Sequence, residues 1–325
     1  MKIFVTAQLD QAVLDYLQSR GEVILGGWGA TGKVLDEQEL VEQATGCEMM
    51  VICYEKMTEY VFRNLPDLRF VSCTRGGMEN FDAQVVKRFP GVQVCNAPGR
   101  NANAVADLTL GLLLDITRNI SLSNHYIRNR DWDHAKWFQA GKLGKKLFMG
   151  YELEGKTIGL IGLGQVGSRV AKRAMGFGMR VIAYDPYCRD KQPEVKLVEL
   201  DALLRDSDCV SLHCKVTEDT RRIIRRESIE KMRPASFLIN TARGELVDEE
   251  DLYLALKEHR LAGAALDTLA VEPIPENHPF LSLDNIVITP HIGGASYDIK
   301  AQQSKIVFED IRAYMEGRRP PHVWP

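Results

Sequence analysis

Residues 157–167 read TIGLIGLGQVG, and this stretch decides the fold. It begins with an apolar run, Thr157 to Ile161, that has the length and composition of a buried strand. Gly162, Gly164 and Gly167 follow in the spacing G-x-G-x-x-G, and the helical stretch Val166 to Phe177 opens within the motif. A strand, a glycine-rich turn and a helix in this order are the context in which the motif binds a dinucleotide.

Each glycine of the motif has its own physical reason. Gly162 permits the tight turn, Gly164 lets the backbone approach a pyrophosphate, and Gly167 lets the helix pack closely on the strand. Gln165 and Val166 lie at the helix start, where oriented N–H groups attract an anion. The alternative is a glycine-rich turn that binds nothing, but the flanking strand and helix favour a cofactor site.

The next strand of the series ends at a carboxylate. Arg180 to Tyr184 is followed by Asp185, roughly 20 residues after the glycine motif, where an acidic side chain accepts hydrogen bonds from the adenosine ribose. The 2′-phosphate of NADP would lie beside a like charge there. The sequence therefore predicts NAD as the cofactor, in preference to NADP.

Apolar strands alternate with amphipathic helices along the chain, which predicts parallel βαβ units and a doubly wound sheet in the second half. With 325 residues, the chain is long enough for two domains. One long helix is expected from Asn101 to Arg130 and another from Ser296 to Met315. Strands are expected at 2–7, 49–52, 70–73 and 92–95, and then at 157–161, 180–184, 209–212, 237–240, 263–266 and 286–289.

Composition and charge argue against several classes of protein. The 41 basic and 44 acidic side chains give a net charge of -3, and the short Arg221–Arg222 and Arg225–Arg226 pairs are interpreted as solvated, so we expect no nucleic-acid partner. The seven cysteines are scattered and form no CxxC pair, which predicts reduced thiols and no metal site. No apolar stretch approaches 18 residues and no signal peptide is recognisable, so we expect a cytoplasmic protein without membrane contact.

Three ionisable residues stand just beyond strands of the second series. Arg243 lies in NTARG (240–244), Glu272 in AVEP (270–273) and His291 in TPHIGG (289–294). The carboxyl ends of such strands are where ligands bind in a doubly wound sheet. Each residue alone has an ordinary structural explanation, but the combination points to catalysis.

These strings, the glycine motif and NANAVAD (101–107) closely resemble the D-isomer-specific 2-hydroxyacid dehydrogenases, which include glycerate, lactate and phosphoglycerate dehydrogenases. The resemblance spans nearly the whole chain and is densest from Gly155 to Ser296. It implies that His291 is the acid/base, Glu272 its partner and Arg243 the cation that anchors the substrate. The residues that it implies along the nicotinamide half of the cofactor site are Thr241, Ala242, Asp267, Gly293 and Gly294.

Apart from the resemblance, these roles are consistent with the chemistry of 2-keto acid reduction. Negative charge develops on the carbonyl oxygen as hydride arrives at C2, so an imidazolium at His291 that donates a proton there contributes roughly 100- to 10,000-fold in rate. Arg243 can present a fixed fork of donors to the substrate carboxylate and carbonyl, which a lysine would do less well. His213 follows the 209–212 strand and is a further candidate for contact with the cofactor.

The resemblance also implies an α/β fold of two domains, a doubly wound Rossmann NAD domain inserted into a flavodoxin-like substrate domain. The substrate domain would comprise residues 1–101 and 295–325, and the NAD domain residues 102–294, with a dimerisation region at about 102–150. Arg75, Gly76 and Gly77 lie in the implied substrate loop (74–80), whose N–H groups can form a nest for a carboxylate. Asp107 departs from the family pattern, which has glutamate there.

Residues 101–150 carry more apolar surface than their own domain is expected to bury. This excess and the habit of the family predict a homodimer. The aromatic side chains concerned are Trp132, Trp137, Phe138, Phe148 and Tyr151.

Two other functions stay open at this point. A formate dehydrogenase would share the fold, but formate has no carbonyl to protonate, and that branch carries an amide in place of the His-Glu pair, so Glu272 argues against it. An NAD(H)-sensing scaffold of the corepressor type would share even the three residues, and turnover of NADH with 2-keto acids would distinguish it. The sequence leaves the identity of the 2-hydroxy acid open.

Overall fold

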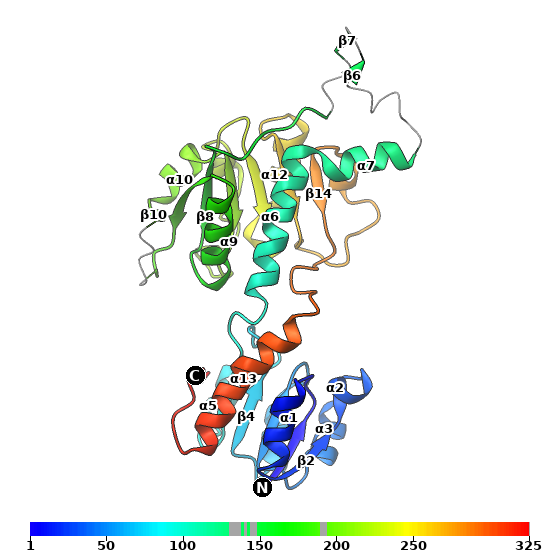
Figure 1. The fold of residues 1–325 in the computed structure, drawn as a ribbon, viewed down its shortest axis with the longest axis vertical. Helices are drawn as coiled ribbons and strands as arrows, with labels where there is room; N and C mark the ends of the chain where they lie inside the picture. The colour runs from blue at the N-terminus through cyan, green and yellow to red at the C-terminus, as the bar shows by residue number, and fades with distance from the viewer. Residues whose placement is uncertain (130–137, 140–141, 144–147, 189–193, 325) are drawn as a thin grey trace. The chain divides into compact units, whose positions relative to one another are not determined.

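The computed structural model describes residues 1–129, 138–139, 142–143, 148–188 and 194–324. The chain forms two compact units, Met1–Asn101 with Ser296–Pro325, and Ala102–Ala295. Each unit contains a parallel sheet with helices on both faces (Figure 1). Trp132 and Trp137, two of the aromatic side chains on which the predicted homodimer rests, lie outside the described residues.

The first unit is a five-stranded sheet in the order β2-β1-β3-β4-β5. This is the strand order of flavodoxin-like folds, as the resemblance to the family implied. The strands are β1 (Lys2–Val5), β2 (Glu22–Leu25), β3 (Met49–Ile52), β4 (Phe70–Cys73) and β5 (Gln93–Cys95). The helices are α1 (Gln11–Gln18), α2 (Gly27–Thr31), α3 (Glu37–Ala44), α4 (Glu59–Asn64), α5 (Ala83–Lys87) and α13 (Ile299–Met315).

Successive residues of the central strands point into two different cores. Ile3 and Val5 of β1 pack with α1 and α13, whereas Phe4 packs with α3, α4 and α5. Strands that are buried on both faces read as continuous apolar runs, which is why β3 and β4 were recognisable in the sequence. The end of the chain returns to this unit through a bridge between Cys95 and Val323.

The second unit is a seven-stranded parallel sheet in the order β10-β9-β8-β11-β12-β13-β14. Read from β8, this is the doubly wound Rossmann order with an additional strand at one edge. The strands are β8 (Thr157–Ile161), β9 (Arg180–Tyr184), β10 (Lys196–Leu197), β11 (Cys209–Leu212), β12 (Phe237–Asn240), β13 (Gly263–Leu266) and β14 (Ile286–Ile288). A separate antiparallel pair is formed by β6 (Phe138–Gln139) and β7 (Lys142–Leu143).

Helices α6 and α9 lie side by side on one face of this sheet, and α10, α11 and α12 cover the other (Figure 1). The helices are α6 (Ala102–Arg118), α7 (Ile120–Arg128), α9 (Gln165–Gly176), α10 (Leu200–Asp206), α11 (Arg226–Ile229) and α12 (Glu249–Lys257), with short 3-10 turns η2 (Gly244–Leu246) and η3 (Pro279–Ser282). The two faces therefore have separate hydrophobic cores, which hold the strand ends in register for the site described below.

The single helix predicted from residue 101 to 130 is wrong, because the structure has two helices there, α6 and α7. Asn119 separates them with a φ of 56°, a left-handed conformation that asparagine tolerates better than most residues. The carboxylate of Asp115 accepts a 2.7 Å hydrogen bond from the Ser121 amide at the start of the second helix. A break made by one residue leaves the apolar periodicity on either side intact, so the sequence pattern did not reveal it.

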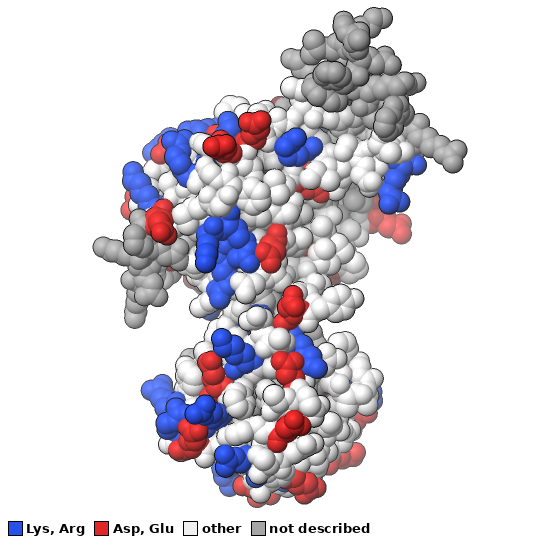
Figure 2. Space-filling view, viewed as in Figure 1, with Lys and Arg blue, Asp and Glu red and all other residues white. Residues whose placement is uncertain are grey.

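Among the described residues, no helix is both long and apolar enough to cross a membrane. On the face that Figure 2 shows, basic and acidic side chains are interspersed on both units.

Candidate active site

The three predicted catalytic residues follow three neighbouring strands of the second unit. Arg243 comes after β12, Glu272 after β13 and His291 after β14, and these strands pair in parallel in that order. The carboxyl ends of parallel strands meet at one edge of a sheet, so the fold places the three residues at the same edge.

His291 and Glu272 form a direct hydrogen-bonded pair. The distance from His291 Nδ1 to Glu272 Oε2 is 2.7 Å, and Glu272 Oε1 accepts a 3.0 Å bond from the Leu269 amide. Partial burial opposes ionisation of Glu272, but the hydrogen bonds from His291 and Leu269, together with the positive charges of His291 and Arg243, lower its pKa below the usual value. With Nδ1 engaged by a carboxylate, Nε2 is the ring nitrogen left to exchange a proton with a substrate.

The turn that carries His291 is held by a buried aspartate. Asp267 Oδ1 accepts hydrogen bonds from the Thr289 hydroxyl at 2.6 Å and the Ile292 amide at 2.9 Å, and Oδ2 accepts one from the Gly293 amide at 2.7 Å. The Asp267 carbonyl accepts the His291 amide at 2.9 Å. His291 itself has a φ of 53°, a conformation that such contacts must maintain. The resemblance implied that Asp267 lies along the nicotinamide half of a cofactor site, and in the structure its carboxylate holds the turn that carries His291.

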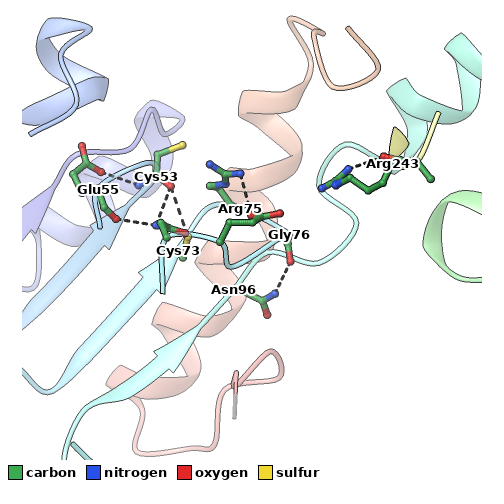
Figure 3. A network of polar contacts seen from close by, with 10 residues as sticks. Cys53, Glu55, Cys73, Arg75, Gly76, Asn96 and Arg243 are labelled. Carbon is green, nitrogen blue, oxygen red and sulfur yellow. Dashed lines mark hydrogen bonds and ion pairs between the residues drawn. The ribbon is translucent and has the colours of Figure 1, made fainter. Parts of the chain in front are cut away.

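Arg243 lies in a turn after β12, which the side chain of Asn240 stabilises from the end of the strand. The Asn240 side chain accepts the Ala242 amide at 3.0 Å and donates to the Arg243 carbonyl at 2.8 Å. Thr241 is buried and its hydroxyl lies 2.9 Å from that of Thr109 on α6. The Arg243 guanidinium donates to the Ala242 carbonyl at 2.8 Å (Figure 3). Sequence reasoning missed Asn240, although asparagine at a strand end is a recognised signal for such a turn.

The glycine motif has the geometry that its spacing predicts. Gly162 has a φ of 98°, and a Cβ there would lie 2.7 Å from the Cys214 amide nitrogen, so only glycine fits. A Cβ on Gly167 would lie 2.2 Å from the Gly162 carbonyl oxygen. A Cβ on Gly164 would meet no described atom within 4 Å, so the backbone there is open to a ligand. Helix α9 begins directly afterwards with Gln165 and Val166.

Asp185 ties the end of β9 to the glycine turn. Its Oδ2 accepts the Leu163 amide at 2.8 Å and its Oδ1 accepts the Tyr187 amide at 2.9 Å. The carboxylate therefore lies beside the glycine motif, where the ribose of a dinucleotide is expected.

His213 follows β11 and borders the same turn. Burial lowers the pKa of His213 to about 3, so the ring is neutral. Its Nε2 lies 2.9 Å from the Ser211 hydroxyl, and its Nδ1 is buried without a hydrogen-bond partner in the part of the chain that the structure describes. The backbone of His213 borders Gly162, and a buried ring nitrogen without a partner among the described residues fits a site that a polar ligand completes.

The predicted substrate loop lies in the first unit, after β4. The Arg75 carbonyl accepts the Ala97 amide at 2.8 Å, and the Gly76 carbonyl accepts the Asn96 side chain at 2.9 Å (Figure 3). These bonds fix the loop that also contains Gly77. The first unit thus contains the predicted site residues Arg75, Gly76 and Gly77, and the second unit contains all the others. Gly294 lies in the second unit, next to Gly293 in the turn that carries His291.

Known proteins resemble this chain along its whole length. Residues 110–293 match a family model described as D-isomer specific 2-hydroxyacid dehydrogenase, NAD binding domain. The glyoxylate reductase of Korarchaeum cryptofilum is 34% identical over 99% of this chain and 95% of its own. The hydroxypyruvate reductase of Thermotoga maritima is 37% identical over 95% of this chain and 97% of its own. The NAD complex of a D-isomer specific 2-hydroxyacid dehydrogenase from Lactobacillus delbrueckii is 26% identical, covers 100% of both chains and gives a TM-score of 0.79.

Proposed function

This chain belongs to the D-isomer-specific 2-hydroxyacid dehydrogenases, and on that premise we propose that Arg243, Glu272 and His291 catalyse the reduction by NADH of a short 2-keto acid such as glyoxylate or hydroxypyruvate. The chain is an NAD-dependent oxidoreductase that acts at C2 of a 2-hydroxy or 2-keto acid. The substrate range is suggested by relatives that carry the names glyoxylate reductase and hydroxypyruvate reductase.

The 2.7 Å hydrogen bond between His291 and Glu272 is the observation that carries the catalytic part of the proposal. Reduction adds a hydride to C2 and a proton to the carbonyl oxygen, and NADH supplies the hydride when it is bound. His291 donates the proton from Nε2, while Glu272 stabilises the positive charge of the ring before transfer and fixes its orientation. In the reverse direction the neutral ring accepts the same proton from the C2 hydroxyl.

Arg243 is proposed to bind the substrate carboxylate and to polarise the carbonyl with its paired donors. Its place after β12, on the edge that also carries the His–Glu pair, supports this role. The N–H groups of Gly76 and Gly77, together with Arg75, are proposed to complete carboxylate binding from the loop after β4. Fixing the carboxylate and the carbonyl of a small substrate limits the face of C2 that it offers to hydride.

The cofactor is proposed to lie along the turns that follow β8, β9 and β11. The open backbone at Gly164 and the α9 start at Gln165 and Val166 suit the pyrophosphate, and Asp185 suits the adenosine ribose. His213, whose Nδ1 has no partner within the described part of the chain, would contact the cofactor from the end of β11. The turns that would flank the nicotinamide are those of Thr241, Ala242, Asp267, Gly293 and Gly294.

A homodimer in the cytoplasm is proposed on two further observations. Helix α7 is amphipathic yet has no buried residue within its own chain, and Ile120 and Ile127 are 53% and 41% exposed. Such a face is suited to a second copy of the chain. All seven cysteines are free, as in a reducing compartment. A monomeric mass by light scattering at micromolar concentration would contradict the dimer.

The experiment that tests the function is NADH oxidation with glyoxylate, hydroxypyruvate, pyruvate and phosphohydroxypyruvate. We expect turnover with glyoxylate or hydroxypyruvate, and its loss in His291→Asn with cofactor binding retained. An inert protein that still binds NADH would point instead to an NAD(H)-sensing scaffold.

A further inference from the structure

A second histidine–glutamate pair of the second unit holds the loop after β13. Glu249, the first residue of α12, accepts a 2.8 Å hydrogen bond from the Ala270 amide at Oε1. Its Oε2 lies 3.4 Å from Nε2 of His278, further along the same loop. The side chains of His278 and Glu249 are only 16% and 19% exposed, so water competes only partly for these contacts. We call these two residues the Glu249–His278 pair.

Two successive amides of this loop bind two different carboxylates. The Leu269 amide donates to Glu272 Oε1 at 3.0 Å, and the same carboxylate holds His291 through Oε2. The next amide, that of Ala270, donates to Glu249. One short piece of backbone therefore connects the Glu249 carboxylate to the partner of the catalytic histidine.

The turn of Arg243 packs directly against this backbone. A Cβ on Gly244 would lie 2.0 Å from the Leu269 carbonyl carbon and 2.2 Å from the Ala270 amide nitrogen. Close packing on Gly244 and the hydrogen bond to Glu249 together fix the Leu269–Ala270 peptide. Loss of the hydrogen bond would leave only the packing.

His278 is itself fixed by the core of the unit. Its Nδ1 accepts a 3.3 Å hydrogen bond from the Phe280 amide, and its ring centroid lies 4.8 Å from that of Phe280, which is fully buried. A ring nitrogen that accepts a hydrogen bond carries no hydrogen, so the neutral ring has its hydrogen on Nε2, which faces Glu249. The hydrogen-bond partners therefore make His278 the donor and Glu249 the acceptor.

The position of Glu249 at a helix start does not explain these contacts. Glu250 lies in the same first turn of α12, and the positive end of the helix dipole favours either carboxylate equally. Glu250 is nevertheless exposed and forms no hydrogen bond or ion pair with any residue that the structure describes. Glu249 differs from its neighbour in its contacts with the loop.

We propose that Glu249 and His278 are positioning residues for the proton-transfer pair of the active site. They hold the Leu269–Ala270 backbone, and through it the Glu272 carboxylate, at hydrogen-bonding distance from His291. The inference rests on the proposed function, which assigns proton transfer to that pair. Without the Glu249–His278 pair, Glu272 can move away from the ring, which impairs catalysis more than substrate binding.

Three substitutions in the first turn of α12 test the carboxylate. Glu249→Met removes both acceptors at a similar side-chain length, so we expect kcat for glyoxylate to fall about ten- to a hundredfold while KM changes little. Glu249→Gln keeps one acceptor oxygen for the Ala270 amide and should recover most of the loss. Glu250→Met is the matched control, because it removes a charge from the same turn, and its kcat should equal that of the wild type.

Two substitutions at His278 separate its two hydrogen bonds. His278→Gln places an amide nitrogen near the position of Nε2 and can still donate to Glu249. His278→Asn places an oxygen near the position of Nδ1 and keeps only the bond from the Phe280 amide. We expect His278→Gln to retain most of the rate and His278→Asn to lower kcat by roughly three- to tenfold, as for the loss of one hydrogen bond.

A pH profile distinguishes positioning from a general loss of stability. A displaced Glu272 carboxylate stabilises the protonated His291 ring less, so in Glu249→Met the limb on which reduction falls with rising pH should move to lower pH. NMR of the His291 ring, assigned by comparison with His291→Asn, follows the same titration without turnover. In a Glu272→Gln background, Glu249→Met should cause no further shift, because no carboxylate is left to displace.

The outcomes separate this inference from the function on which it rests. A wild-type protein that reduces no 2-keto acid overturns the proposed function, and the NMR titration then still decides whether Glu249 acts on His291. Wild-type kcat in Glu249→Met overturns the inference, and so does a loss of rate with a lowered melting temperature and an unmoved titration. A further shift in the Glu272→Gln background also overturns it, because Glu249 would then act by another route. Equal kcat values in His278→Asn and His278→Gln overturn the role of His278.

Discussion

The Thr289 hydroxyl donates a 2.6 Å hydrogen bond to the carboxylate of Asp267, which is only 2% exposed. Thr289 directly follows β14 and leads into the turn that carries His291, and Asp267 directly follows β13. The hydrogen bond therefore joins the ends of two neighbouring strands. The orientation of the His291 ring consequently depends on a residue that needs no contact with the substrate.

Thr289→Val should therefore impair the chemistry more than binding. Loss of the hydroxyl leaves Asp267 with fewer donors and lets the turn shift, so we expect kcat to fall about ten- to a hundredfold while KM changes little. Thr289→Ser should restore most of the rate. The matched control is Thr268→Val, because the buried Thr268 hydroxyl has no hydrogen-bond partner among the described residues. Equal effects of both valine variants would contradict the role of the bond.

Arg243→Lys should damage turnover although it keeps the charge. An ammonium cannot direct two donors to the carboxylate and the carbonyl of one substrate, so we expect kcat/KM to fall by about a hundredfold or more. Steady-state kinetics with the best 2-keto acid measure the effect, and Arg225→Lys on the exposed surface of the same unit serves as the control. Near-normal kinetics in Arg243→Lys would move the anchoring role elsewhere, with Arg75 the first residue to examine.

Asp185 should set the preference for NADH over NADPH. Asp185→Ala removes the charge that repels a 2′-phosphate, so the ratio of kcat/KM values for the two cofactors should narrow by about tenfold. The same change also removes the acceptor of the Leu163 amide and should weaken binding of both cofactors. Asp185→Asn keeps an acceptor there and separates the two effects. Equal use of NADH and NADPH by the wild type would refute the assignment.

Much of the fold was predictable because buried parallel strands leave a strong pattern. Strands β3, β4 and β8 are buried at every residue and appear in the sequence as short, predominantly apolar runs. The prediction missed β2, which has no buried residue, and β10, which has two exposed residues. Both are edge strands. Strand β2 carries the apolar run Val23 to Leu25, a signal that the prediction overlooked, whereas β10 has only two residues and is too short to leave a pattern.

The sequence predicted the residues of the candidate site but not all of their contacts. Motif strings located Arg243, Glu272 and His291, and the fold brings their strand ends to one edge of the sheet. The contacts of Asp267 were not foreseen, because a hydrogen bond between residues 22 positions apart, such as Thr289 with Asp267, depends on strand order. Those of Asn240 are local, with Ala242 and Arg243, and its position at a strand end was a signal that the prediction overlooked. Periodicity and spacing describe neighbours along one element only.

His213 should make the second unit sensitive to acid. Burial lowers the pKa of His213 to about 3, whereas the pKa of a histidine in an unfolded chain is about 6.5. Below about pH 6.5 the unfolded chain therefore binds a proton at this residue that the folded chain does not bind. The free energy of unfolding should therefore fall as pH decreases, by about 2 kcal/mol between pH 7 and pH 5 from this residue. Urea unfolding of His213→Gln should lack that component, whereas His259→Asn, at an exposed histidine, should retain it. Parallel pH dependences in all three proteins would contradict the prediction.

The His291–Glu272 pair should control the pH dependence of the reaction itself. The hydrogen bonds and charges around Glu272 lower its pKa below the usual value, against the effect of partial burial, so the carboxylate stays ionised throughout an assay range of about pH 5 to 9. Over that range it stabilises the protonated His291 ring, while the charge of Arg243 opposes protonation. The carboxylate should prevail, because its 2.7 Å hydrogen bond acts at shorter range and Arg243 is neutralised by the substrate carboxylate.

Glu272→Gln removes this stabilisation while keeping an acceptor near Nδ1. Because reduction requires the protonated ring, the limb on which reduction falls with rising pH should move to lower pH. Oxidation requires the neutral ring and should gain activity at lower pH relative to its own maximum. Glu276→Gln, which removes an exposed carboxylate from the same loop, controls for a general change in charge. If the Glu272→Gln profiles overlay those of the wild type in both directions, with only a uniform loss of rate, then Glu272 orients the ring and contributes nothing to holding its proton.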